Sequence, residues 1–147
     1  MDFIIFGLVA YILGSIPTSV WIGKAYYDLD IREHGSCNAG ATNTFRVLGK
    51  KPGIIVLLID VAKGSLAVLL PYFILGSRID EERLVLIQIL TAIMAVVGHV
   101  FPLFANFDGG KGVATSLGVI IGLHPPAALL CLVSFLIVFI ADKEQVR

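Results

Sequence analysis

Near its start the chain carries an uncharged apolar run, FIIFGLVAYILGSIPTSVWIG (residues 3–23). As an α-helix of 21 residues, at about 1.5 Å per residue, this run would be about 31 Å long, the thickness of a bilayer's hydrocarbon core. A signal peptide would begin with basic residues, whereas here Asp2 precedes the run. The stretch therefore predicts a first transmembrane helix that is retained.

The overall composition supports a membrane protein. Of the 147 residues, 57% are hydrophobic and only 15% are charged, a balance more apolar than that of a soluble domain. The formal net charge is zero, so no global field favours nucleic acid. Cys37 lies in a polar stretch and Cys131 in an apolar one, so we expect two unpaired thiols and no metal site.

Three further apolar blocks follow, at residues 53–77, 84–107 and 112–141. The sequence HPP (residues 124–126) interrupts the last block, and proline disfavours a continuous helix there. We therefore divide it into two short segments, 112–123 and 127–141. The prediction is an all-α integral membrane protein with about five membrane segments in a single domain, residues 1–147.

The basic residues of the connecting loops indicate an orientation. Residues 24–51 contain five Lys and Arg, the densest cationic cluster of the chain. Short loops rich in Lys and Arg stay on the cytoplasmic side of a membrane. We therefore expect the N-terminus outside and the loops before residues 53 and 113 together on the cytoplasmic face.

Two glycine-rich polar runs interrupt the apolar pattern: GSCNAGATNTFR (residues 35–46) and DGGKG (residues 108–112). Glycine allows backbone N–H groups to turn toward a ligand, and the nearby cations supply charge, so the pair predicts a phosphate site at the membrane surface. A nucleotide-binding P-loop is excluded, because no lysine follows Gly40 and the run does not follow a strand.

Within the first run, the spacing predicts a short helix that Thr42 caps and Gly49 ends. On this helix Asn43, Arg46 and Lys50 would share one face. The helix start, preceded by glycines, would be an anion site. A loop whose cations only fix the topology or touch anionic lipid remains an alternative.

Ionisable residues also lie inside the apolar blocks. Asp60 and Lys63 are one turn apart, which fits either an intrahelical ion pair or a functional site. His99 ends the helical segment of the third block before Pro102, close to the DGGKG run, and is either structural or a proton carrier. No histidine has an Asp five positions later, and no Gly-x-Ser-x-Gly sequence is present.

Together these motifs resemble the bacterial acyl-phosphate:glycerol-3-phosphate acyltransferase (PlsY) family. The resemblance is carried by GSIP (14–17), GSCNAGATN (35–43) with Arg46, LGKK (48–51), DxxKG (60–64), GHxxP (98–102) and GGKGVAT (109–115). It covers nearly the whole chain. It implies a seven-helix protein of the bacterial cytoplasmic (inner) membrane that makes lysophosphatidic acid from acyl phosphate and glycerol 3-phosphate, in phospholipid synthesis and without a cofactor.

This chemistry needs cations and hydrogen-bond donors, because both substrates carry phosphate and the acyl phosphate is already activated. We expect Arg46, Lys50 and Lys111 to bind phosphate. Hydrogen-bond donors and close backbone approach would come from Ser36, Thr42, Asn43, Gly110 and Gly112. His99 would be the proton carrier, unless the substrate's own phosphate assists the transfer.

The resemblance also has departures. Members of the family continue with further helices and a third polar motif, so we expect this chain to be incomplete and to have little activity alone. Asp108 stands where the family commonly has a cation or a neutral residue, which would weaken the local positive field. A small transporter subunit and an inactive truncated homologue are the alternative functions.

Overall fold

The computed structural model describes residues 1–134, and no strand occurs among them. The prediction of an all-α fold is confirmed. The helices are α1 (Asp2–Gly14), α2 (Thr18–Tyr27), α3 (Ala41–Val47), α4 (Lys50–Leu75), α5 (Glu81–Val100) and α6 (Val113–Leu123), with 3-10 turns at Ile31–Glu33, Gly76–Arg78 and Leu103–Ala105. A further helix spans Pro125–Ser134.

Three helical stretches are long and apolar enough to cross a membrane: Asp2–Tyr27, Lys50–Arg78 and Glu81–Ala105. Val113–Leu123 and Pro125–Ser134 are shorter apolar helices, separated at residue 124 as the prolines predicted. Most large apolar side chains of these two short helices are exposed on the outside of the bundle, where lipid would solvate them. The part of the predicted fifth segment after residue 134 lies outside the described residues.

The first apolar run lies within a stretch that is long and apolar enough to span a membrane, as predicted, but it is not the single continuous helix that we expected. α1 ends at Gly14 and α2 begins at Thr18, with Pro17 as its N-cap residue. Proline has no N–H to donate and disfavours helical geometry at the residue before it. The carbonyl oxygen of Ile16 is thereby available to a side chain from α4.

The helix of the third apolar block ends just after His99, before Pro102, as predicted. α5 stops at Val100, and Pro102 prevents its continuation. The remaining residues of the block form the turn Leu103–Ala105 and a loop that leads to α6. This loop contains the GGKG sequence, so the end of α5 before Pro102 gives the second polar run its irregular backbone.

Glycines allow the helices to cross at close range. A Cβ at Gly14 would overlap the carbonyl oxygen of Ala95, and a Cβ at Gly118 would overlap that of Val61. α1 therefore packs directly on α5, and α4 packs directly on α6. Small residues at helix crossings are typical of membrane proteins, in which association depends on close packing rather than on the hydrophobic effect.

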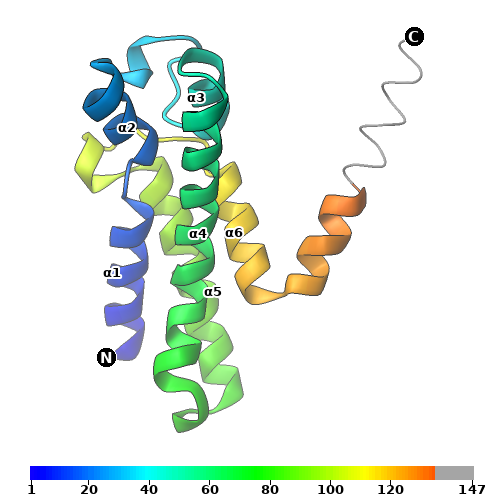
Figure 1. Cartoon of the computed structure of the whole chain (residues 1–147). Coiled ribbons are helices and arrows are strands. Elements are labelled where there is room, and N and C mark those ends of the chain that lie inside the picture. The colour runs from blue at the N-terminus through cyan, green and yellow to red at the C-terminus, as the bar shows by residue number, and fades with distance from the viewer. Residues whose placement is uncertain (135–147) are drawn as a thin grey trace.

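Figure 1 shows that α1, α4 and α5 run side by side, with α2, α3 and the loops that carry the two polar runs gathered at the end of the bundle opposite the N-terminus. The helix Pro125–Ser134 leans away from the rest. The two polar runs, far apart in sequence, thus lie at the same end of the bundle. This shared end is what the predicted site required.

Candidate active site

A cleft of about 340 Å³ opens where the two glycine-rich runs meet α4, α5 and α6. Both runs contribute to its wall, so the prediction that they come together is confirmed by their geometry. The lining residues are Ser36, Asn38, Gly40, Ala41, Thr42, Asn43, Arg46, Leu57, Asp60, His99, Lys111, Gly112, Val113, Ala114 and Leu117.

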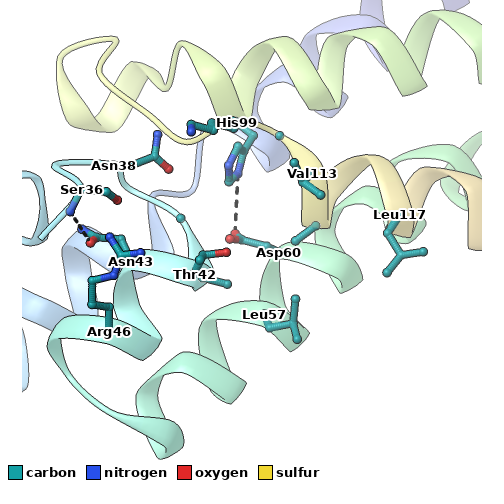
Figure 2. Close-up of a pocket in the computed structure, with 15 residues that line it drawn as sticks. Ser36, Asn38, Thr42, Asn43, Arg46, Leu57, Asp60, His99, Val113 and Leu117 are labelled. Atoms are coloured by element: carbon teal, nitrogen blue, oxygen red, sulfur yellow. Dashed lines mark hydrogen bonds and ion pairs between the residues drawn. The ribbon is translucent and has the colours of Figure 1, made fainter. Parts of the chain in front are cut away.

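Asn43 organises the first run. Its Nδ2 donates to the carbonyl oxygens of Ile31 at 3.0 Å and His34 at 2.9 Å, and its Oδ1 accepts the backbone N–H of Ser36 at 2.9 Å. Both amide hydrogens are therefore used within the protein. Asn43 shapes the loop in which Ser36 lies (Figure 2), whereas the sequence had suggested a donor to substrate.

The short helix is close to the predicted one, but its ends differ. Gly40, not Thr42, is the N-cap residue, and Thr44 Oγ1 donates to the Gly40 carbonyl oxygen at 3.0 Å. Gly49 follows the helix with a φ of 94°, a conformation suited to glycine. Thr42 is left exposed in the wall of the cleft, free of a capping role.

The predicted cations separate into two groups. Arg46 and Lys111 are exposed residues that line the cleft, one from each polar run. Lys50 is the first residue of α4 and lies outside the lining, so it does not share the α3 face with Arg46 as predicted. The helix ends at Val47 and Gly49 redirects the chain before Lys50.

The second run packs against His99. The backbone N–H of Gly110 donates to the His99 carbonyl oxygen at 3.1 Å, and a Cβ on Gly110 would overlap Nε2 of the imidazole. Gly110 thus lies behind His99 rather than in the lining, while Gly112 reaches the cleft with a φ of 77°. Gly110 was predicted to allow close approach of the backbone to a ligand. The close approach that the structure shows is between the Gly110 backbone and His99.

Asp60 is a buried carboxylate with three side-chain neighbours. Its Oδ1 lies 2.9 Å from Lys63 Nζ and 3.7 Å from His99 Nδ1, and it accepts from Thr18 Oγ1 at 3.4 Å. Lys63 in turn donates to the Ile16 carbonyl oxygen, at 2.9 Å. The predicted intrahelical ion pair of Asp60 and Lys63 is therefore confirmed, and it is buried. Asp60 also lines the cleft, and a functional role of the pair stays a prediction.

Asp108, which was expected to weaken the local positive field, is an exposed residue at the start of the second run. Its carboxylate lies 3.8 Å from the guanidinium of Arg32 and is 67% exposed to solvent. Arg32 also binds both carboxylate oxygens of Asp30, so its charge is shared between two carboxylates. The expected effect of Asp108 on the field at Lys111 stays a prediction.

Polar and apolar side chains occupy different sides of the cleft. Figure 2 shows Ser36, Asn38 and Arg46 on one side, and a group of apolar side chains on the other. The apolar group comes from α4 and α6 and comprises Leu57, Val113 and Leu117. Such a cleft can hold a charged head at one side and a hydrocarbon chain at the other.

Two features of the cleft had escaped the sequence analysis. Asn38 lines it, although a single Asn in a loop carries no spacing signal. Asp60 supplies the carboxylate that faces His99, from 39 positions earlier in the chain, where a search for nearby Asp residues could not find it. Within residues 1–134, no group of three or more His, Cys, Asp or Glu side chains is placed to hold a metal ion.

The fold and the cleft define a class: helical membrane proteins with a cationic, glycine-lined site at one end of the bundle. Comparison with known proteins specifies it further. Residues 4–145 match the family model described as glycerol-3-phosphate acyltransferase. The chain therefore belongs to the glycerol-3-phosphate acyltransferase family, and the resemblance seen in the motifs is confirmed.

Individual relatives agree. Proteins named glycerol-3-phosphate acyltransferase are 48% identical over 97% of this chain in Listeria monocytogenes serovar 1/2a and 52% identical over 85% in Streptococcus equi subsp. equi. A crystal structure of PlsY (YgiH), an integral membrane glycerol 3-phosphate acyltransferase in its glycerol 3-phosphate form, superimposes with a TM-score of 0.82 at 36% identity over 95% of this chain. The lysophosphatidic acid form gives a TM-score of 0.77.

The chain spans 70% of the Listeria protein, 55% of the Streptococcus protein and 66% of the crystallised chain. At the level of the family, the predictions of an acyltransferase and of a multi-pass membrane protein are confirmed. The acyl donor, the residues that bind substrate and the side of the membrane stay predictions.

Proposed function

We propose that the cleft binds glycerol 3-phosphate together with an acyl phosphate, and that it serves acyl transfer to give lysophosphatidic acid. One observation carries the proposal: two glycine-rich runs meet at a cleft that Arg46 and Lys111 line, with aliphatic side chains on the side opposite Arg46. The crystallised relatives are described as glycerol 3-phosphate and lysophosphatidic acid forms, which fits the same acceptor and product.

In this proposal, Arg46 and Lys111 neutralise the substrate phosphates, with Ser36 and Thr42 as hydrogen-bonding neighbours. Charge-assisted contacts to phosphate are strong when the donors are fixed in place. The acyl chain lies against Leu57 and Leu117, which extend the cleft between α4 and α6.

The transfer itself needs no cofactor. A hydroxyl oxygen of glycerol 3-phosphate attacks the acyl carbonyl carbon, the bond from that carbon to the phosphate oxygen breaks, and inorganic phosphate leaves. The hydroxyl proton passes either to His99 or to the departing phosphate. Nδ1 of His99 faces the carboxylate of Asp60. A His99→Gln variant distinguishes these routes, because the enzyme loses most of its turnover only if the proton passes to His99.

We further propose that the cleft opens on the cytoplasmic face of a bacterial inner membrane. The Lys- and Arg-rich loop between α2 and α4 supports this orientation. Single cysteines at Ser36 and at the exposed Asp108, in a background without Cys37 and Cys131, should react with an impermeant maleimide only after the cells are opened. Labelling of intact cells at either position would contradict a shared cytoplasmic site.

The decisive assay follows labelled glycerol 3-phosphate into lysophosphatidic acid in liposomes, with acyl phosphate as donor. It compares the 147-residue chain with a chimera that continues into the remaining part of the Listeria relative. That the chain alone turns over little substrate stays a prediction. If the chimera, correctly folded, neither binds glycerol 3-phosphate nor forms product, the proposed function is wrong.

A further inference from the structure

Arg32 joins the two polar loops of the molecule. Its Nε and Nη2 donate to the two carboxylate oxygens of Asp30, at 2.9 and 2.7 Å. Its Nη1 donates across to the other loop, to the carbonyl oxygen of Ala105 at 2.8 Å and that of Asp108 at 3.5 Å. One guanidinium thus connects residues more than 70 positions apart.

The Arg32 side chain is well suited to this connection. Its planar group of donors can bind a carboxylate with one edge and a carbonyl oxygen with another, which a lysine ammonium cannot do in the same geometry. The side chain is only 15% exposed, so water competes weakly for these bonds. The hydrogen bonds from Arg32 hold the pKa of Asp30 well below its usual range, and the bonded carboxylate raises the pKa of Arg32.

The loop that receives these bonds has a demanding backbone. Asn106 and Phe107 are two successive non-glycine residues with positive φ, at 55° and 60°. Such conformations cost energy and persist only where surrounding contacts enforce them. Arg32 binds the carbonyl groups immediately before and after this pair, at Ala105 and Asp108.

The same loop leads directly into the cleft. Two residues beyond Asp108, Gly110 donates to the His99 carbonyl oxygen, and Lys111 and Gly112 then line the cleft. An error in the loop's position at Asp108 would therefore be transmitted to Lys111. Arg32 itself is not part of the lining, so it acts at a distance from the ligand.

We propose that Arg32 is a positioning residue, a clasp that holds the loop of residues 103–112 so that Lys111 meets the phosphate of the substrate. The part of this proposal that concerns substrate rests on the proposed function. The clasp itself is a property of the free protein and is testable without any ligand.

Lys24 provides a matched control. It also pairs with Asp30, at 3.1 Å, but its side chain is 57% exposed, and among residues 1–134 Asp30 is the one acidic side chain that it contacts. Lys24→Met therefore removes one cation from Asp30 and leaves the second loop untouched. An effect of Arg32→Met that Lys24→Met does not share reports the connection between the loops.

The first experiment measures amide hydrogen exchange of the 147-residue chain in nanodiscs, with peptides from α4 as the internal reference. We expect Arg32→Met to speed exchange across residues 103–112 by about 10-fold or more, the loss expected for charge-assisted hydrogen bonds. Lys24→Met should stay within about twofold of the parent, and Arg32→Lys should recover only part of the protection. Unchanged exchange in Arg32→Met, or full protection in Arg32→Lys, would overturn the clasp.

The second experiment uses the active chimera and separates binding from turnover. Arg32→Met should raise the KM for glycerol 3-phosphate about 10-fold or more while kcat changes less, because Lys111 is displaced rather than removed. A fall in kcat with KM unchanged would refute the positioning role even where the exchange result holds. Failure of the proposed function is distinct, since the parent chimera would then lack activity and substrate binding altogether.

Discussion

The apolar half of the bundle and its polar end are held together by different means. In the apolar half, glycines place helix backbones in direct contact, as at Gly14 against Ala95 and Gly118 against Val61. At the polar end, single side chains connect distant segments: Asn43 binds three backbone groups and Arg32 joins two loops.

This difference follows from the surroundings of each half. Within lipid, burial of apolar surface does not drive helices together, so close packing must do so. At the membrane edge the backbone is irregular, and its N–H and C=O groups need partners that regular helices provide for themselves. The fold therefore uses small residues where helices cross and hydrogen-bonding side chains where the cleft forms.

The buried ion pair of Asp60 and Lys63 lies between the two halves, and breaking it should have the largest effect. Lys63→Met leaves the Asp60 carboxylate buried without its ammonium partner, which should cost roughly 3–5 kcal/mol of the free energy of unfolding. Unfolding in detergent micelles measures this cost. The double variant Asp60→Asn with Lys63→Met should recover part of it.

Arg83→Met is the control for that comparison. Arg83 also forms an ion pair, with Asp2 at 3.1 Å, but its side chain is 49% exposed. Removing it should cost at most about 1 kcal/mol. If Lys63→Met is no more destabilising than Arg83→Met, the buried pair is not a structural link between the halves.

Within the polar end, the two groups of cations should differ in their effect on substrate. Arg46→Ala should lose roughly 2–4 kcal/mol of transition-state binding in the chimera, because it removes a charge-assisted contact from the cleft wall. Lys50→Ala, outside the lining, should cost much less. Measured as kcat/KM for glycerol 3-phosphate, equal losses in the two variants would show that the cleft does not define the phosphate site.

The sequence predicted the apolar half better than the polar end. Hydrophobic segments and proline breaks are local signals, and they located α4, α5 and the end of α6 at Leu123. The break at Pro17 was missed because the run around it is uncharged and long enough to span a membrane. Transmembrane helices tolerate proline, so a single proline within such a run does not by itself predict a break.

At the polar end, local spacing predicted which loops meet but not what each residue does. Asn43, Arg46 and Lys50 have helical spacing, yet Gly49 turns the chain and separates Lys50 from the others. Asp60, which faces His99, lies 39 positions away from it, and the Ala105 carbonyl oxygen that Arg32 binds lies more than 70 positions away. Contacts of this kind depend on the tertiary fold and leave no periodic pattern in one sequence.

In the apolar half, Gly118 and Gly7 should differ in how well they tolerate an added methyl group. Gly118→Ala would push a Cβ into the Val61 carbonyl and separate α6 from α4, which should cost about 1–3 kcal/mol. Gly7→Ala on α1 would meet only the Leu90 and Met94 side chains, at 3.4 Å or more, and should be nearly neutral. Thermal unfolding in one detergent ranks the two variants, and equal stabilities would contradict close backbone packing of α4 on α6.

The smallest effect is expected from pH at the Arg32 clasp. Asp30 faces Lys24 and Arg32, and His34 Nδ1 lies 3.0 Å from its backbone carbonyl oxygen. Because the folded pKa of Asp30 is depressed, its contribution to stability is present above the unfolded pKa of about 3.9 and is lost only as the pH falls through the lower folded value.

Protection of residues 103–112 against hydrogen exchange, corrected for the intrinsic rate, should therefore be the same at pH 8 and pH 5. His34 contacts the loop only through the Asp30 carbonyl oxygen, to which an Nδ1–H donates. Peptides from α4 again supply the reference. Loss of protection between pH 8 and pH 5 would mean that a histidine, rather than the Asp30–Arg32 pair, holds the loop.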